Sequence, residues 1–463
     1  MTPDDGQHAL QRIACWSSTL SYAAIPDDVR SVARRCLIDT LGVTIAGVRT
    51  DVADRSRKFA CMVGAPGDAG VVGAQTRLAA PMAAFANAVA AHALDFDDNS
   101  YAGVVHGSAV IIPAALAIAE TVNASGADLV TAIVAGSEAE YALGVAVTPT
   151  LYDRGWWTTG VLGPVGAAAA TARLLKLDAS ATASALGLAL AGTGGVKAAF
   201  GTNAKPLLAG RAAEAGVVAA LLAAAGASGP GDAVEHPRGF AALFNGGIFE
   251  AQAIAALGTR WHLLDPGIDV KRIPVCLSSH AAVDAVQDLV AQHGLAVCDI
   301  RRITCDVPSV VAANLAYDCP QTPQEAQFSM SFAVAAALRF GDIRLEHLTD
   351  AVVADKATVT LMDKVIMHTG PRWSDPAARA AAPEGAHVRI DLNSGQTLDG
   401  YRARPRGSAG EPLSDAEIDT KFRHCATVLL EAASADTLLR NLQSVEVLPS
   451  TRDLLDVLHR EPV

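Results

Sequence analysis

The stretch HALDFDDNSYAGVVHGSAVIIPAALAIAE, from His92 to Glu120, is the part of the sequence that most narrows the choice of fold. It ends in a long apolar segment, and apolar segments with helical spacing recur on both sides of it. Several of them are apolar on most faces, which is typical of helices packed between other helices. The predicted helices cover residues 27–48, 79–94, 110–122, 127–147, 163–175, 180–191 and 207–225.

The pattern changes after Leu264. SSHAAVDAVQDLVAQHG, at 278–294, predicts one amphipathic helix, and IRRITCDVPSVV, at 300–311, predicts a strand. Two more strands are predicted near 357, in ATVTLMD, and near 386, in AHVRIDLNSGQTLDGYRARP. Ser414 then stands three residues before Glu417, a capping-box spacing that predicts a return to helix.

We therefore predict a mainly α protein in which a large helical domain is joined to a smaller α/β domain. The predicted boundaries are 1–266 for the helical domain, 267–400 for the α/β domain, and 401–463 for C-terminal helices that pack back on the helical domain. A chain of 463 residues is long enough for two such cores.

The composition argues against two kinds of binding partner and indicates a cellular compartment. The formal net charge is −12 and no basic run occurs, so we expect neither nucleic acid nor an anionic membrane as a partner. The apolar run AGVVAALLAAAGA, from Ala215, is shorter than the roughly 20 residues that span a bilayer. The N-terminus has no secretory pattern, and the eight cysteines form no CxxC pair, which predicts reduced core thiols in a cytoplasmic protein.

The first candidate site is the acidic segment that follows the predicted helix 79–94. Asp95, Asp97 and Asp98 lie within four residues, and His106 follows. Carboxylates in so apolar a neighbourhood lose hydration energy, which is tolerated where they cap helices, bind a cation or orient a catalytic base. From the residues alone, capping of the helix near Ser108 is the more frequent explanation.

Two further segments carry lysines. Lys205 stands beside a proline just ahead of a predicted long helix, where it could neutralise a substrate carboxylate or simply lie on the surface. Lys271, Cys276 and His280 stand at the predicted domain junction, where ligand clefts are common. A lysine and a histidine close together suit proton transfer next to a carboxylate, whereas a metal site at Cys276 and His280 lacks further ligands nearby.

Taken together, the motifs resemble the MmgE/PrpD family, which includes 2-methylcitrate dehydratases, cis-aconitate decarboxylases and iminodisuccinate epimerase. The resemblance runs in order over nearly the whole chain. The motifs that carry it are HALDFDDNS, HGSAVIIPAALAIAE, GVLGPVGAAAATARLL, FGTNAKPLLAGRAAEAGVVAALLAAAGASGP, HPRGFAALF, KRIPVCLSSHAAVDA and EAQFSMSFAVAAAL.

The resemblance implies an all-helical domain, an α/β lid domain, a homodimer, and a cleft between the domains that binds a small polycarboxylate without metal or organic cofactor. By matching motifs, it implies a site made of Asp95, Asn99, His106, Lys205, Lys271, His280 and Tyr317. In this interpretation His106, Lys271 and Tyr317 transfer protons with Asp95 orienting His106, while Lys205, His280 and Asn99 bind substrate.

The sequence also departs from the family pattern. GWWTTG has Trp157 where relatives that dehydrate or decarboxylate commonly carry histidine, and Ala142 stands where arginine is frequent. Cys276 replaces a histidine of the decarboxylases, and one residue is inserted between Asn99 and His106.

Loss of a proton donor at Trp157 favours epimerisation, which needs only two proton-transfer groups and carboxylate binding. We therefore expect an isomerase, an epimerase of an iminodisuccinate-like dicarboxylate. The alternatives are a 2-methylcitrate-type dehydratase or cis-aconitate-type decarboxylase and, less favoured, a helical scaffold without catalysis.

Overall fold

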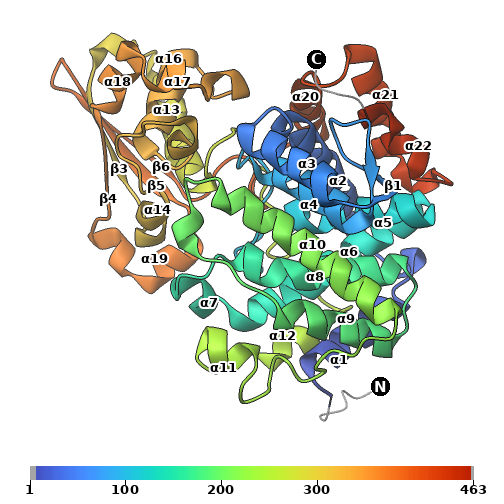
Figure 1. Cartoon of the computed structure of the whole chain (residues 1–463). Coiled ribbons are helices and arrows are strands. Elements are labelled where there is room, and N and C mark those ends of the chain that lie inside the picture. The colour runs from blue at the N-terminus through green and yellow to red at the C-terminus, as the bar shows by residue number, and fades with distance from the viewer. Residues whose placement is uncertain (1–6, 460–463) are drawn as a thin grey trace.

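The computed structural model describes residues 7–459 and shows a large helical domain beside a small α/β domain (Figure 1). One hydrophobic core joins residues 9–270 with residues 413–458, and a second core lies within residues 273–398. The mainly α fold with a small α/β domain is therefore confirmed. The C-terminal helices contribute Leu438, Leu439 and Leu442 to the core of the helical domain.

The helical domain is built from long apolar helices that pack against one another. Helices α4, α5, α6 and α8 contribute core residues along nearly their whole length, because each is surrounded by other helices. Its principal helices are α1 (Ala9–Thr19), α2 (Asp27–Gly47), α3 (Asp51–Val63), α4 (Ala80–His92), α5 (Ser108–Val122), α6 (Gly126–Val147), α8 (Thr158–Leu174), α9 (Ala179–Ala191), α10 (Ala204–Ala224), α20 (Asp415–Ala426) and α21 (Ala432–Gln443). The shorter elements are α7 (Thr150–Asp153), α11 (Phe240–Asn245), α12 (Ala251–Ala255), α22 (Arg452–Leu455), β1 (Pro66–Gly70) and β2 (Arg77–Leu78).

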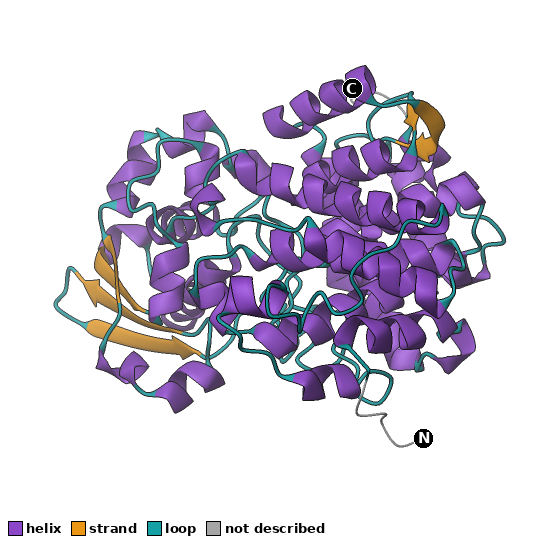
Figure 2. Cartoon of the chain, turned by 60° about the horizontal axis from the view of Figure 1, so that its bottom comes forward, coloured by secondary structure: helices purple, strands orange, loops and turns teal. Residues whose placement is uncertain are grey.

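The α/β domain holds a four-stranded sheet at its outer edge, with helices between the sheet and the helical domain (Figure 2). The strand order is β4-β3-β5-β6; β3 runs parallel to β4 and antiparallel to β5, and β5 and β6 form a hairpin. The strands are β3 (Ile300–Asp306), β4 (Val365–His368), β5 (Ala386–Leu392) and β6 (Thr397–Arg402). The helices are α13 (His280–His293), α14 (Ser309–Asn314), α15 (Pro323–Ala326), α16 (Met330–Phe340), α17 (Asp350–Val353), α18 (Lys356–Met362) and α19 (Pro376–Ala381).

Most predicted elements are present, including the hairpin around NSG and the Ser414 capping box, in which Glu417 binds back to the Ser414 backbone. The strand predicted near 357 is wrong, because that segment is α18. Asp355 caps this helix by accepting from the backbone N–H groups of Ala357 and Thr358, and this local stabilisation prevails over the β-branched composition. The strand predicted at 300–311 also ends early, at Asp306, because Pro308 is the N-cap of the short helix α14.

Two compositional expectations need correction. Cys36, Cys305 and Cys425 are buried, but the thiols of Cys15, Cys61, Cys298 and Cys319 are exposed, so only some of the cysteines are core residues.

The apolar run from Ala215 belongs to α10, which begins eleven residues earlier. By length and composition, α6 and α10 could each span a membrane, although 94% of the apolar window of α6 is buried inside the protein.

Candidate active site

A pocket of about 440 Å³ lies where the loop between α4 and α5 meets the segment that leads into α13. Five of the seven residues predicted for the site line it, and both domains contribute to its walls. The lining residues are Asp95, Asn99, Val104, His106, Tyr152, Trp157, Phe200, Lys205, Lys271, Cys276, Leu277, Ser278, Asn314, Phe328 and Glu384.

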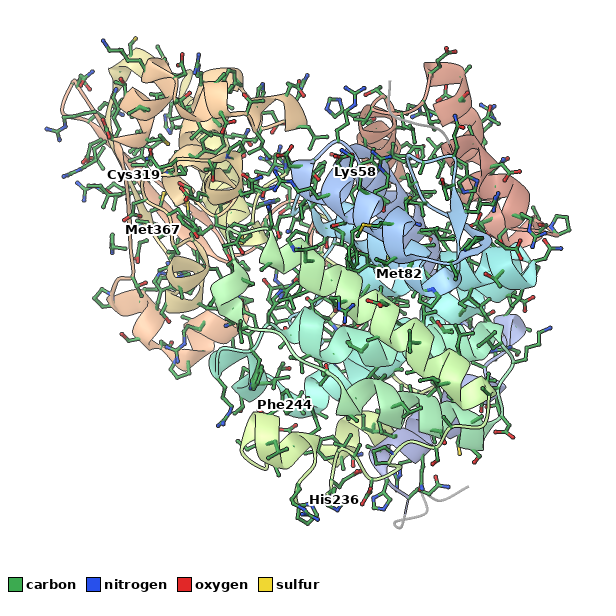
Figure 3. The ribbon with its side chains drawn as sticks, viewed as in Figure 1. Lys58, Met82, His236, Phe244, Cys319 and Met367 are labelled. Carbon is green, nitrogen blue, oxygen red and sulfur yellow. The ribbon has the colours of Figure 1, made fainter. Side chains whose placement is uncertain are left out.

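A larger cavity of about 1250 Å³ lies within the α/β domain beside β4, but its lining contains neither lysine nor histidine. Cys319 and Met367, which line it, lie at the outer side of that domain (Figure 3). An anionic substrate has no cationic group to bind there, so the smaller, charged pocket is the candidate active site.

The loop that carries the acidic segment is tied to the domain junction through its backbone. The N–H of Asn99 donates to the carbonyl of Asp269 at 2.9 Å, and the N–H of Asp269 donates back at 2.8 Å. This pair brings Lys271 beside Asp95. Val104, which also lines the pocket, has a φ of 55°, a conformation that a β-branched residue rarely adopts. Such strain is frequent at functional sites.

Asp95 forms ion pairs with both predicted lysines. Lys271 Nζ lies 2.8 Å from Asp95 Oδ2 and 2.7 Å from the Asp95 carbonyl, and Lys205 Nζ donates to Asp95 Oδ1. The ammonium groups hold the pKa of Asp95 below its ordinary value despite burial, and Asp95 in turn raises the pKa of Lys271. Two ammonium groups against one carboxylate leave a net positive charge, which suits an anionic substrate.

Lys205 lies in the first turn of α10, not ahead of the helix as predicted. Aromatic rings surround its ammonium: the Phe200 and Phe328 centroids lie 4.9 Å from Nζ, and that of Trp157 lies 5.9 Å away. Cation–π attraction and the ion pair with Asp95 both keep this ammonium in place. Trp157 was expected at the place of the relatives' histidine, whereas Phe200 and Phe328 were not predicted as part of the site, because they come from separate segments of the chain.

His106 is oriented by acceptors at one ring nitrogen. Its Nδ1 lies 2.9 Å from the carbonyl of Asp98 and 3.3 Å from Oδ2 of Asp97. Because a carbonyl can only accept, we assign the ring proton to Nδ1, which leaves Nε2 as the basic nitrogen. Burial lowers the pKa of His106 to about 4, although the Asp97 carboxylate opposes this effect. The ring is therefore neutral near pH 7 and can accept a proton.

Asp97, rather than Asp95, is the carboxylate that contacts His106. The same Oδ2 lies 2.8 Å from Nδ1 of His92, and the two histidine rings are 4.7 Å apart. The predicted role of Asp95 thus falls to Asp97, because both carboxylate oxygens of Asp95 are paired with lysines in a separate cluster. The aspartates of this loop do not cap α5. The N-cap residue of that helix is Gly107, and no side-chain capping hydrogen bond forms there.

His92, Asp97 and His106 are also the group within residues 7–459 that could hold a metal ion, with ligand atoms within 4.8 Å of one another. Hydrogen bonding to the shared oxygen already accounts for this arrangement. The net positive charge of the lysine cluster nearby disfavours an added cation.

The three residues at which the sequence departs from the family pattern lie in different surroundings. Trp157 is 1% exposed, lines the pocket and lies 5.3 Å from the His92 ring, so its indole fills space where an acid–base group would otherwise face the substrate. Cys276 lines the pocket too, and burial raises the pKa of its thiol to about 11, which keeps it neutral. Ala142 is fully buried in the core of the helical domain and outside the pocket lining.

His280 and Tyr317 do not line the pocket. His280 Nε2 lies 3.0 Å from the carbonyl of Val275, and burial lowers the pKa of His280 to about 3, so the ring is neutral and cannot attract a carboxylate by charge. Tyr317 donates its hydroxyl to the carbonyl of Phe200 at 3.3 Å. In this structure both residues support the pocket walls, and direct substrate contact by either remains a prediction.

A set of polar residues at the site was not predicted. Tyr152 donates to Asn314 Oδ1 at 2.9 Å, Asn314 donates to the Ser278 hydroxyl at 3.2 Å, and Glu384 faces the same pocket. Nothing in their local sequence marks them as a group, because they come from four separate segments of the chain.

These features define a pocket with a neutral histidine and a net positive lysine cluster, lined by residues of both a helical and an α/β domain. Comparison with known proteins identifies its family: the MmgE/PrpD N-terminal domain matches residues 11–252, and the MmgE/PrpD C-terminal domain matches residues 273–444. The chain belongs to the MmgE/PrpD family.

The chain is 28% identical to a cis-aconitate decarboxylase of Homo sapiens over 439 residues, which is 92% of this chain and 89% of the relative. It is 27% identical to a cis-aconitate decarboxylase-like protein of Aspergillus oryzae over 96% of both chains, and 24% identical to a cis-aconitate decarboxylase of Aspergillus terreus over 96% of this chain and 95% of the relative. The comparisons therefore support an enzyme of dehydratase or decarboxylase type and favour the predicted alternative over the epimerase.

Proposed function

We propose that this protein is a lyase that acts on a small polycarboxylate, and that decarboxylation of a cis-aconitate-like tricarboxylate is the first reaction to test. The observation that carries the proposal is the position of neutral His106 beside the net positive cluster of Asp95, Lys205 and Lys271. Lysine ammoniums can bind substrate carboxylates and stabilise the negative charge that develops next to them.

In decarboxylation, the electron pair of the broken carbon–carbon bond stays on the substrate and is delocalised toward a remaining carboxylate or double bond. Lys271 is suited to stabilise this charge, because its raised pKa keeps it protonated. The same raised pKa argues against Lys271 as a base, so His106 Nε2 is the better candidate for accepting a proton.

Epimerisation of an iminodisuccinate-like dicarboxylate is the second candidate, and Trp157 is the observation that favours it. An indole cannot protonate a leaving group, whereas proton removal and return at one carbon needs no such group. The same pocket charge would bind either substrate.

Incubation with cis-aconitate, 2-methylcitrate and iminodisuccinate in heavy water distinguishes the reactions. We expect carbon dioxide and a deuterated unsaturated acid from the tricarboxylate, measured by mass spectrometry. Deuterium in the α-position of iminodisuccinate, with inverted configuration by chiral separation and no alkene, would support the epimerase instead. Lack of turnover of all three substrates would contradict the proposed function.

A further inference from the structure

The loop between α19 and β5 belongs to the α/β domain (Figure 1). Glu384 lies in this loop and contributes to the pocket lining from that domain. It lines the same pocket as His106 and Lys271. Its Oε2 is buried without a hydrogen-bond partner. A buried carboxyl oxygen that the protein leaves unpaired is costly unless the group is protonated or meets a ligand.

The surroundings of Glu384 favour its protonated form. Burial raises its pKa to about 7, and the charge of Asp269 adds to this effect. The hydroxyls of Ser278 and Tyr101 and the ammonium of Lys271 act in the opposite direction. Glu384 therefore differs from Asp95, whose two ammonium partners keep it ionised.

Glu384 also lines a second cavity, of about 740 Å³, together with Tyr101, Asp269 and Arg404. Arg404 and Asp265, which lines this cavity as well, are solvent-exposed. Glu384 thus borders both the active-site pocket and a cavity with solvent-exposed lining residues, and a proton lost to the substrate can be replaced through that second cavity.

The opposite protonation states of His106 and Glu384 form a complementary acid–base pair. Between about pH 4 and pH 7, His106 is unprotonated while Glu384 retains its proton. Two titratable groups whose surroundings separate their pKa values in this way are suited to act as base and acid in one site.

We propose that Glu384 is a catalytic residue that donates a proton to the substrate, a role that Trp157 cannot fill. This inference rests on the proposed lyase function. As the carbon–carbon bond to the departing carboxylate breaks, its electron pair stays on the substrate. A carbon–hydrogen bond then forms with the Glu384 proton while carbon dioxide leaves, and the resulting carboxylate is reprotonated from the solvent-facing cavity.

The test compares Glu384→Gln with Glu384→Asp and with Glu346→Gln, a control in the same domain whose side chain is 52% exposed. Glutamine keeps the shape but has no acidic proton. We expect Glu384→Gln to lower kcat by about 100-fold or more, with KM changed less than about threefold, because a general acid contributes 10²–10⁴-fold. Aspartate should restore part of the rate, and the control should match the wild type.

The pH profile gives a readout that a purely structural role would not change. Wild-type kcat should fall as pH rises through about 7, since Glu384 loses its proton there, and this limb should be absent from the residual activity of Glu384→Gln. The infrared difference spectrum between the wild type and Glu384→Gln should contain a protonated carboxyl band that disappears over the same pH range.

The outcomes are distinguishable. An active wild type with an equally active Glu384→Gln variant would overturn the donor role and leave the proposed lyase function intact. A wild-type enzyme that is inactive toward every polycarboxylate would contradict both the donor role of Glu384 and the proposed lyase function. A wild-type infrared spectrum identical to that of the variant from pH 5 to pH 9 would contradict the protonated state on which the donor role depends.

Discussion

Asp95 and Asp98 lie three residues apart on one loop, and both are buried, at 3% and 0% exposure. Asp95 faces the pocket and contacts Lys205 and Lys271, which lower its pKa. Asp98 faces the interior of the helical domain near Ser108 and Cys36, and burial raises its pKa to about 7. The difference shows that partners, not burial alone, decide whether a carboxylate here is ionised.

The interior side also contains an acid without a hydrogen-bond partner. Glu140 of α6 has no hydrogen-bond partner for either carboxyl oxygen, and burial raises its pKa to about 8, assisted by the charge of Asp98. His106 lies between the two sides, since its ring contacts the backbone of Asp98 and lines the pocket. The pocket side is thus charged, whereas on the interior side Glu140 is mostly protonated and Asp98 about half protonated at pH 7.

The largest effect on activity is expected from removing the imidazole of His106, which lies between the pocket side and the interior side. His106→Ala should lower kcat by about 10³–10⁴-fold, because no other neutral base in the pocket can replace Nε2. The melting temperature should stay close to that of the wild type. The matched control, His293→Ala, changes an exposed residue at the end of α13 and should retain full activity. Wild-type turnover by His106→Ala would rule out His106 as the base.

Asp95→Asn tests the pocket side. It leaves two buried ammonium groups without their carboxylate, and we expect the free energy of unfolding at pH 7 to fall by about 3–5 kcal/mol. The pKa of Asp95 is lowered in the folded state, so its contribution is present above the ordinary aspartate pKa of about 4 and declines as pH falls below it. Urea titrations at pH 7 and pH 3 measure this difference.

The control for this variant is Asp51→Asn, which breaks an exposed pair with Arg55 and should cost less than about 1 kcal/mol. Equal losses in the two variants would mean that the buried cluster contributes no more than a surface pair.

Glu140→Gln tests the interior side and should have the smallest effect at pH 7. The folded-state pKa is raised, so the stability linked to Glu140 is present below about pH 4.5 and is lost as pH rises through about 8. The variant should therefore be more stable than the wild type at pH 9, by up to about 4 kcal/mol, and similar at pH 5. Thermal unfolding from pH 5 to pH 9 measures this, with exposed Glu431→Gln as the control. A pH-independent difference would contradict the neutral state of Glu140.

Much of the fold could be predicted from the sequence because long apolar helices have a clear period. The prediction for 127–147 differs from α6 by one residue at its start. Elements whose local sequence signals conflict are harder to predict. In α18, the β-branched residues favour a strand, while Asp355 caps a helix. The last residues of the predicted segment 401–463, from 460 onward, lie outside the described part of the chain.

The sequence by itself determined the helical character of the protein, the family resemblance, and the concentration of acid between Asp95 and His106, because these depend on composition and order along the chain. Only the tertiary structure decided which acid meets which cation. Asp95 pairs with lysines 110 and 176 residues away, Asp97 contacts His106, and Glu384 enters the pocket from the other domain. Protonation depends on distance and burial, and neither is encoded in the spacing of residues along the chain.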